Sequence, residues 1–262
     1  MSAALKAGGR LVLKVGGAIL DDAAKRAAFA ASVARVIEEL DASVVVVHGG
    51  GAQLSRQCER LGIDVQRNDR GLRITDEATL AAAVQVLAGE VNAALVTALS
   101  AASVAAIGMT GADAGLMKAR RLDASLGAVG EVESVSAAVL DRLSHAGFVP
   151  VVATLAPELP ETSGSSAAGS ATAGSGGSSL LNVNADAAVA PIAAAYDADA
   201  VLFLSDVAAV LNGPVLESAE PLESLSPASA KELEASGALG GGMIPKVDAA
   251  LAAVNALPNA LV

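Results

Sequence analysis

The hydrophobic pattern begins with two short apolar runs, each of which ends in glycines. Val44-Val45-Val46-Val47 leads into His48-Gly49-Gly50-Gly51, and Leu11-Val12-Leu13-Lys14-Val15 leads into Gly16-Gly17. Continuous apolar runs of this length are typical of strands buried on both faces, as in a parallel sheet. We therefore expect strands at 10–15 and 43–48, with a helix at about 22–40 between them.

The same alternation of strand and helix patterns continues along the chain. We expect a long helix at 76–100 with Thr75 as its cap, and a hairpin formed by 116–121 and 128–133. The remaining expected strands are 104–108, 148–153 and 200–204, and the remaining helices are 52–61, 136–146, 185–196, 226–236 and 245–256. This order predicts an α/β fold, a three-layer αβα sandwich with a mainly parallel central sheet.

One stretch, 156–179, is dominated by Ser, Gly, Ala, Pro and Thr and shows no periodicity. Such composition is typical of a flexible loop. It lies at the end of an expected N-terminal lobe, residues 1–180, and residues 181–262 would form a C-terminal lobe.

Composition argues against several classes of protein, namely nucleic-acid-binding, membrane-bound and secreted proteins. The 262 residues carry a formal net charge of −11, which argues against nucleic acid or an anionic membrane as a partner. The single cysteine, Cys58, fits a reducing compartment, and the first ten residues lack the apolar core of a signal peptide. The most apolar region, 184–204, is interrupted by three aspartates, so we expect a cytoplasmic protein without a membrane span.

Candidate chemistry gathers at the expected strand ends and helix starts, where open α/β sheets bind ligands. Neither glycine junction matches the P-loop or the dinucleotide-binding pattern. Phosphoryl transfer nevertheless requires groups of the kind found here. They are lysines, backbone N–H groups at glycines and a carboxylate that orients the lysines. The features concerned are Lys14 with Gly16-Gly17, Gly49-Gly50-Gly51, Asn182-x-Asn184-x-Asp186, and Gly240-Gly241-Gly242 followed by Lys246.

Seven segments, in order along the chain, resemble the acetylglutamate kinases of the amino acid kinase family. They are Leu13-Lys14-Val15-Gly16-Gly17, Val47-His48-Gly49-Gly50-Gly51, Gly71-Leu72-Arg73-Ile74-Thr75-Asp76, Leu87-Ala88-Gly89-x-Val91-Asn92, Asn182-Val183-Asn184-Ala185-Asp186, Leu204-Ser205-Asp206-Val207 and Gly241-Gly242-Met243-Ile244-Pro245-Lys246. The resemblance implies ATP-dependent phosphorylation of the side-chain carboxylate of N-acetyl-L-glutamate, the second step of arginine biosynthesis.

The resemblance also implies a role for each matching residue. Lys14 and Lys246 would stabilise the transferring phosphoryl group, and Asp186 would orient both lysines. Gly17 and Gly50 would donate N–H bonds to that group, and Gly50-Gly51 would lie against the substrate. Arg73 and Asn182 would hold the α-carboxylate, a role that a guanidinium fork suits.

Residues Asp206, Val207, Ala208, Ala209, Val210, Leu211, Ala238, Leu239 and Gly240 would border ATP. Magnesium would be carried by the nucleotide phosphates, without a protein ligand. The resemblance implies that residues 1–180 bind the amino-acid substrate and form the dimer contact, and that residues 181–262 bind ATP. A homodimer through the helix 76–100 is the implied assembly. His48 is expected to be structural, because a carboxylate nucleophile is already ionised and needs no general base.

Two departures from the family pattern leave alternatives open. The segment 156–179 replaces a short structured crossover, and the family continues after the last helix for a strand or two, without which we expect an unpaired sheet edge and a weakened ATP lobe. One alternative is a kinase for carrier-protein-linked aminoadipate or glutamate. Another is a catalytically inactive, nucleotide-binding regulatory homologue.

Overall fold

The computed structural model describes residues 6–68, 71–160, 179–205, 209–212, 220–239 and 243–262. A central sheet of five parallel strands has the order β3-β6-β2-β1-β9. Its strands are β1 (Arg10–Val15), β2 (Ser43–His48), β3 (Ala106–Thr110), β6 (Val149–Ala153) and β9 (Ala200–Leu204). The predicted parallel sheet is confirmed, and three of its strands have the predicted bounds.

A second, four-stranded sheet, β4-β5-β8-β7, lies beside the first. It consists of β4 (Met117–Arg121), β5 (Val129–Val135), β7 (Leu155–Pro157) and β8 (Leu180–Val183). The antiparallel β4–β5 pair is the predicted hairpin, and β5 and β8 run parallel. The prediction of a loop from residue 156 was wrong at its start, because Leu155, Ala156 and Pro157 pair with β8. Residues 161–178 of that prediction lie outside the described residues, and on either side of them the Glu158 N–H donates to the Ser179 carbonyl at 2.7 Å.

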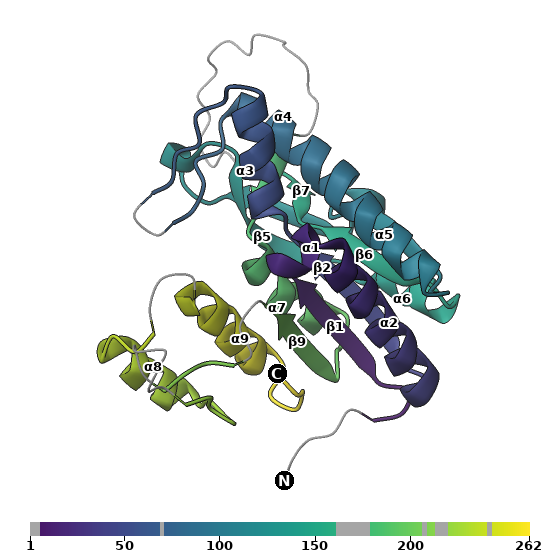
Figure 1. Ribbon diagram of the computed structural model, residues 1–262. Helices are drawn as coiled ribbons and strands as arrows, with labels where there is room; N and C mark the ends of the chain where they lie inside the picture. The colour runs from purple at the N-terminus through teal and green to yellow at the C-terminus, as the bar shows by residue number, and fades with distance from the viewer. Residues whose placement is uncertain (1–5, 69–70, 161–178, 206–208, 213–219, 240–242) are drawn as a thin grey trace.

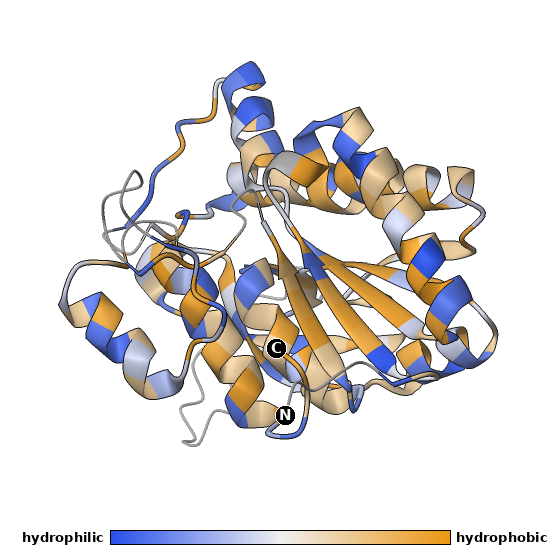
Figure 2. Ribbon diagram, turned by 60° about the horizontal axis from the view of Figure 1, so that its bottom comes forward, coloured by the Kyte–Doolittle hydropathy of each residue, from blue (hydrophilic) through white to orange (hydrophobic). Residues whose placement is uncertain are grey.

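Helices cover both faces of the central sheet, which gives the predicted three layers (Figures 1 and 2). They are α1 (Ala18–Asp21), α2 (Ala23–Leu40), α3 (Gly51–Arg60), α4 (Glu77–Val84), α5 (Asn92–Ala101), α6 (Ala138–His145), α7 (Ala185–Ala195), α8 (Pro227–Ala235) and α9 (Ile244–Ala256). Short 3₁₀ turns occupy Asp113–Gly115 and Ala124–Leu126.

Alternate residues of the strands in the central sheet pack into two separate hydrophobic cores, one on each face of the sheet. Leu11 and Leu13 of β1 face α2, α3 and the α4–α5 helix, whereas Val12 faces α6, α7 and the small sheet. This alternation is the period of two that a strand imposes, with both faces apolar. A third small cluster joins α8 to α9 around Ala230, Leu239 and Val247.

The helix predicted at 76–100 is present but differs in two respects. Its cap is Asp76, whose carboxylate accepts a hydrogen bond from the Thr79 N–H, and not Thr75. Thr75 is fully buried and pairs with Gly127 instead. Between α4 and α5 the helix widens into a π-helical segment, Gln85–Val91.

By length and composition, the run Glu77–Ala101 could cross a membrane, and 44% of its most apolar window is buried within this fold. Core helices of soluble proteins satisfy the same test. Here Ala82, Ala83 and Leu95 of this run pack into the core beneath the central sheet.

The edge of the central sheet at β9 is partly covered. Leu261 accepts a hydrogen bond from the Val201 N–H at 2.7 Å and donates one to the Asp199 carbonyl at 2.9 Å. The expectation of an unpaired edge was therefore wrong at the first residues of β9, where Ala200 and Leu261 form a parallel bridge. Further along β9, Leu202 is 38% exposed.

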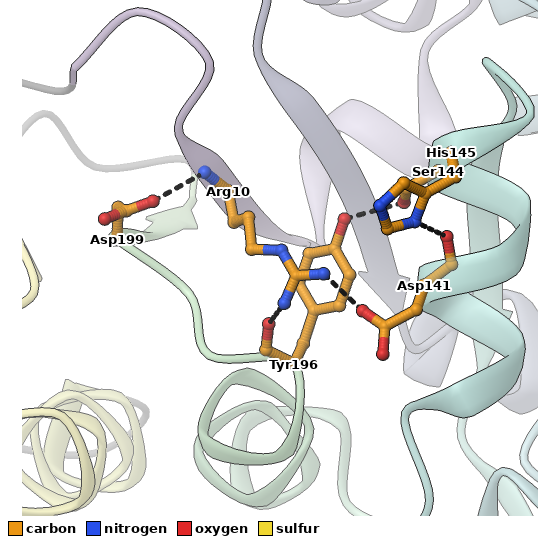
Figure 3. A network of polar contacts seen from close by, with 6 residues as sticks. All are labelled: Arg10, Asp141, Ser144, His145, Tyr196 and Asp199. Carbon is orange, nitrogen blue, oxygen red and sulfur yellow. Dashed lines mark hydrogen bonds and ion pairs between the residues drawn. The ribbon is translucent and has the colours of Figure 1, made fainter.

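A polar network ties the start of β1 to α6 and to the end of α7 (Figure 3). The Arg10 guanidinium lies 4.3 Å from the centroid of the Tyr196 ring and pairs with Asp141 of α6. The Tyr196 hydroxyl, in a fully buried side chain, lies 2.6 Å from the Ser144 hydroxyl. The Arg10 N–H donates to the Asp199 carboxylate at 2.8 Å.

Tyr196→Phe should lower the free energy of unfolding by about 1 kcal/mol, because it removes one partly buried hydrogen bond while keeping the ring under Arg10. Ser144→Ala should lower it by a similar amount. Since both variants remove the same bond, the double variant should lose little more than either single one. Urea denaturation of the four proteins measures this, and fully additive losses would show that the two hydroxyls act independently.

Candidate active site

A cavity of about 250 Å³ opens at the carboxyl ends of the central strands. Its walls come from the ends of β1 and β2, the N-termini of α3 and α7, the segment around Arg73, and β5 and β8. The lining residues are Lys14, Gly16, Gly17, Gly49, Gly50, Gly51, Leu54, Arg67, Gly71, Leu72, Arg73, Leu87, Val129, Thr154, Asn182, Val183, Asn184, Ala185 and Asp186. Every residue predicted for catalysis or substrate binding, except Lys246, lines this one cavity.

The charged centre of the site is a lysine–aspartate–lysine line. The Lys14 Nζ lies 2.7 Å from Asp186 Oδ1, and the Lys246 Nζ lies 4.0 Å from Asp186 Oδ2. Lys14 is only 5% exposed. Burial lowers the pKa of Lys14, the Asp186 carboxylate opposes that effect, and the Lys246 charge adds to it. One carboxylate thus holds two ammonium groups beside the cavity.

The N-terminus of α7 places Asp186 in this line. Asn184 caps the helix, and its side-chain oxygen accepts hydrogen bonds from the N–H groups of Asp186, at 2.8 Å, and Ala187. Asp186 therefore lies in the first turn of α7, where the helix dipole favours a negative charge. Asn182, two residues before the cap, lies on β8 and lines the cavity.

In each of the two glycine junctions, one glycine lies so close to a neighbouring side chain that a Cβ would crowd it. A Cβ at Gly16 would lie 2.8 Å from the Lys14 Nζ, and one at Gly50 would lie 2.7 Å from Leu87 Cδ2. Gly17 has a φ of 50° and a ψ of −126°, a conformation that other residues rarely adopt. The backbone of Gly50 and Gly51 opens α3, so the free N–H groups of the first helical turn lie at the cavity wall.

Arg73 is a buried guanidinium with a free nitrogen. Its Nη2 donates to the Gly51 carbonyl at 3.0 Å and to Ser55 Oγ at 2.7 Å. Its Nη1 is buried and has no hydrogen-bond partner among the described residues. Burial lowers the pKa of Arg73, and the nearby Arg67 charge lowers it further. A guanidinium with this geometry is suited to a carboxylate ligand.

His48 is held neutral next to the glycines. Its side chain is fully buried, its Nδ1 lies 2.8 Å from the Gly49 carbonyl and its Nε2 lies 2.9 Å from the Asn92 amide nitrogen. This arrangement places the ring proton on Nδ1, with Nε2 accepting from Asn92. Burial lowers the pKa of His48 to about 4. The structure thus agrees with a structural role for His48.

A second cavity, of about 300 Å³, lies between β9 and α9. Of the residues predicted to border ATP, Ala209 and Val210 line it, and Leu211 pairs with Pro221 close by. Leu239 instead packs between α8 and α9, and the Ala238 N–H is bonded to Leu233 at the end of α8. Asp206, Val207, Ala208 and Gly240 lie outside the described residues.

The two cavities meet at Asp186 and Lys246. Asp186 lines the first cavity, Lys246 lines the second, and the two side chains form one ion pair. A ligand in each cavity would therefore have its reacting end beside the same line of charges.

Several lining residues were not anticipated from the sequence. Arg67 lies in a polar segment without a strand or helix pattern, and Thr154 follows β6 with its hydroxyl bonded to the Val183 carbonyl at 2.9 Å. Asn184 was visible in the Asn-x-Asn-x-Asp segment, but its capping role was not predicted. A polar residue directly before an alanine-rich helix was the signal for it.

Two cavities joined at two lysines and a carboxylate define a phosphotransferase site in an α/β fold. Residues 9–260 match the amino acid kinase family. A solved structure of smu.665 from Streptococcus mutans has the same fold, with a TM-score of 0.74, 22% identity, and 94% of this chain and 91% of that one covered.

The chain belongs to the amino acid kinase family, and several of its curated relatives are acetylglutamate kinases. That of Methanopyrus kandleri is 40% identical over 253 residues, which cover 94% of this chain and 90% of the relative. That of Cereibacter sphaeroides is 37% identical, with 95% of this chain and 78% of the relative covered. The chain is thus an enzyme that transfers a phosphoryl group.

The neutral His48 should make the fold sensitive to acid. Between its ordinary pKa of 6.5 and about 4, the unfolded chain binds a proton that the folded chain excludes. The free energy of unfolding should therefore fall as the pH falls through this window, by about 3 kcal/mol in total from this group.

Urea denaturation between pH 7 and pH 4 tests this in the wild type, His48→Asn and His145→Gln. The chain has two histidines, so the exposed His145 is a matched control. His145→Gln should keep the wild-type pH dependence and His48→Asn should flatten it. If the free energy of unfolding of His48→Asn fell with pH as steeply as that of the wild type, His48 would not be the group responsible.

Proposed function

We propose that this chain phosphorylates the side-chain carboxylate of N-acetyl-L-glutamate with ATP, which yields N-acetyl-L-glutamyl 5-phosphate and ADP in arginine biosynthesis. The observation that carries the proposal is the line Lys14–Asp186–Lys246 at the junction of the two cavities. The acetylglutamate kinases named above support the choice of substrate.

In this reaction a carboxylate oxygen attacks the γ-phosphorus of ATP. A new P–O bond forms, the bond between the γ-phosphorus and the bridging oxygen breaks, and ADP leaves with the electron pair. The nucleophile is already ionised, so no proton has to be removed. This agrees with a neutral, buried His48 that serves the fold.

The catalytic roles follow from the positions of the charges. Lys14 and Lys246 stabilise the transferring phosphoryl group from either side of Asp186, which keeps both ammonium groups oriented. The N–H groups of Gly17 and Gly50 donate to the same group. These donors are fixed before the reaction, so little reorganisation is needed in the transition state.

The substrate roles use the first cavity. The free Nη1 of Arg73 and the amide of Asn182 hold the α-carboxylate, and the backbone of Gly50 and Gly51 lies against the substrate. The cavity volume of about 250 Å³ accommodates an acylated amino acid of this size.

ATP is assigned to the second cavity. Ala209 and Val210 line it, and Leu211, Ala238 and Leu239 belong to the same part of the chain. Asp206, Val207, Ala208 and Gly240 are proposed to complete this border. Residues 1–180 are proposed as the amino-acid lobe and 181–262 as the nucleotide lobe, with Asn182 and Asp186 of the second part also lining the first cavity.

A divalent cation, Mg²⁺, is proposed to enter with the nucleotide. The described residues contain no group of three or more His, Cys, Asp or Glu side chains that could hold a metal ion. Polyphosphate oxygens are ligands that Mg²⁺ prefers, and the cation would neutralise charge on the phosphates. The protein supplies Lys14 and Lys246 for the remaining charge.

A coupled assay of ADP release with N-acetyl-L-glutamate, L-glutamate and L-aspartate tests the proposal. Turnover should be specific for N-acetyl-L-glutamate, and Lys14→Met should lower kcat by at least about a hundredfold, because a preorganised charge at the transition state is lost. Lys118→Met, which changes an exposed lysine on β4, should leave kcat unchanged. Preference for an unacylated amino acid, or full activity of Lys14→Met, would contradict the proposal.

We also propose a cytoplasmic homodimer that forms through the α4–α5 helix. The helix is apolar, yet more than half of its most apolar window is not buried in the single chain. Ala78, Ala81 and Ala93 are exposed on it. Small residues of this kind allow two helices to approach closely.

Ala81→Glu should convert the dimer to a monomer, because it places a charge in the apolar surface proposed for the contact. Ala27→Glu, at an exposed alanine of α2, is the matched control and should stay dimeric. Light scattering coupled to size-exclusion chromatography gives the mass, and circular dichroism checks the fold. A wild type that is monomeric at micromolar concentration, or a dimeric Ala81→Glu variant, would exclude this interface.

A further inference from the structure

Two arginines face each other at the mouth of the first cavity. Arg67 and Arg73 form an antiparallel bridge, and both side chains line the cavity. Residues paired across such a bridge project to the same face, and like charges placed opposite one another repel. Burial lowers the pKa of Arg73, and the neighbouring Arg67 charge lowers it further.

No described acidic side chain compensates for this pair. Arg73 donates to Ser55 and to the Gly51 carbonyl, and the Arg67 Nη1 donates to the Gly71 carbonyl at 2.7 Å. Neither guanidinium forms a salt bridge with a described residue, and the Arg73 Nη1 is buried without a described partner. Two uncompensated guanidiniums and a free buried donor at one cavity indicate that the cavity binds an anion.

The net charge of the side chains around the cavity indicates how much negative charge a bound ligand can carry. The charged side chains that line it are Lys14, Arg67, Arg73 and Asp186, an excess of two positive charges. The chain as a whole carries a net charge of −11. The lining of the cavity is therefore positive although the chain is negative. Two positive charges would balance a ligand with two carboxylates, one beside Lys14 and one beside Arg67 and Arg73.

We propose that Arg67 is a second binding group for the α-carboxylate and, together with Arg73, selects acylated amino acids that keep this carboxylate free. The inference rests on the proposed function and adds a specificity residue to it. Arg73 acts from the buried wall through its free Nη1. Arg67 is exposed at the mouth and acts through the nitrogens that are not bonded to Gly71.

The test compares two ligands that differ only in this carboxylate. N-Acetyl-L-glutamate carries it, and 4-acetamidobutyrate has the same acylated chain without it. The variants are Arg67→Gln, Arg67→Lys, and Arg60→Gln as a control at an exposed arginine that ends α3. For each protein we would measure kcat and KM for N-acetyl-L-glutamate, and the dissociation constants of both ligands by calorimetry.

Arg67→Gln should weaken the binding of N-acetyl-L-glutamate about tenfold and raise its KM to the same extent, with kcat within about threefold of wild type. Its affinity for 4-acetamidobutyrate should stay at the wild-type value, because the group that Arg67 contacts is absent. Arg67→Lys should recover part of the loss, since it keeps the charge but not the fork. Arg60→Gln should bind both ligands as the wild type does.

Two results would overturn the role of Arg67 alone. One is an unchanged affinity of Arg67→Gln for N-acetyl-L-glutamate, and the other is an equal loss for both ligands, which would indicate a general effect on the cavity. Failure of the proposed function gives a different result, since the wild type itself would then neither bind nor phosphorylate N-acetyl-L-glutamate.

Discussion

The ion pair between Lys14 and Asp186 is the interaction on which the site depends. A lysine in a buried strand is costly unless its charge is paired, and the partner here comes from the first turn of a helix that begins 171 residues further along the chain. Asn184 caps that helix and so sets the position of the carboxylate. The end of β1, the cap of α7 and the approach of Lys246 are therefore one arrangement, in which each part requires the others.

The glycine segment at the cavity also depends on the π-helical segment that packs against it. The wider turn at Gln85–Val91 brings Leu87 and Val91 against Gly50, and it leads directly into Asn92, which bonds to His48. π-Helical segments of this kind occur frequently at functional sites. The histidine beside the glycines is thus part of the packing that shapes the cavity, and a larger residue at position 50 would press on Leu87 and Val91 behind it.

Much of the fold was predictable, and the failures share one cause. The strands β1, β2 and β9 are continuous apolar runs, and their bounds agree with prediction because burial on both faces leaves a clear local pattern. Thr75 and β7 were misread because their partners, Gly127 and β8, lie far away in the sequence. In the site, the lysines, glycines and Asp186 were found because they mark strand ends and helix starts. Arg67 and Thr154 also line the cavity, but no sequence pattern of a strand end or helix start pointed to them.

The position of β1 has a consequence for how the protein is made. This strand is an inner one, and it pairs on one side with β2 and on the other with β9, whose residues lie 189 positions later in the chain. Such long-range pairings slow folding, because a large loop must close before the contact is gained. During synthesis β1 emerges well before β9, so the edge of β1 that pairs with β9 stays open until β9 has left the ribosome. Lys14, for which we propose a catalytic role, therefore lies on a strand whose second edge is paired only after most of this chain has been made.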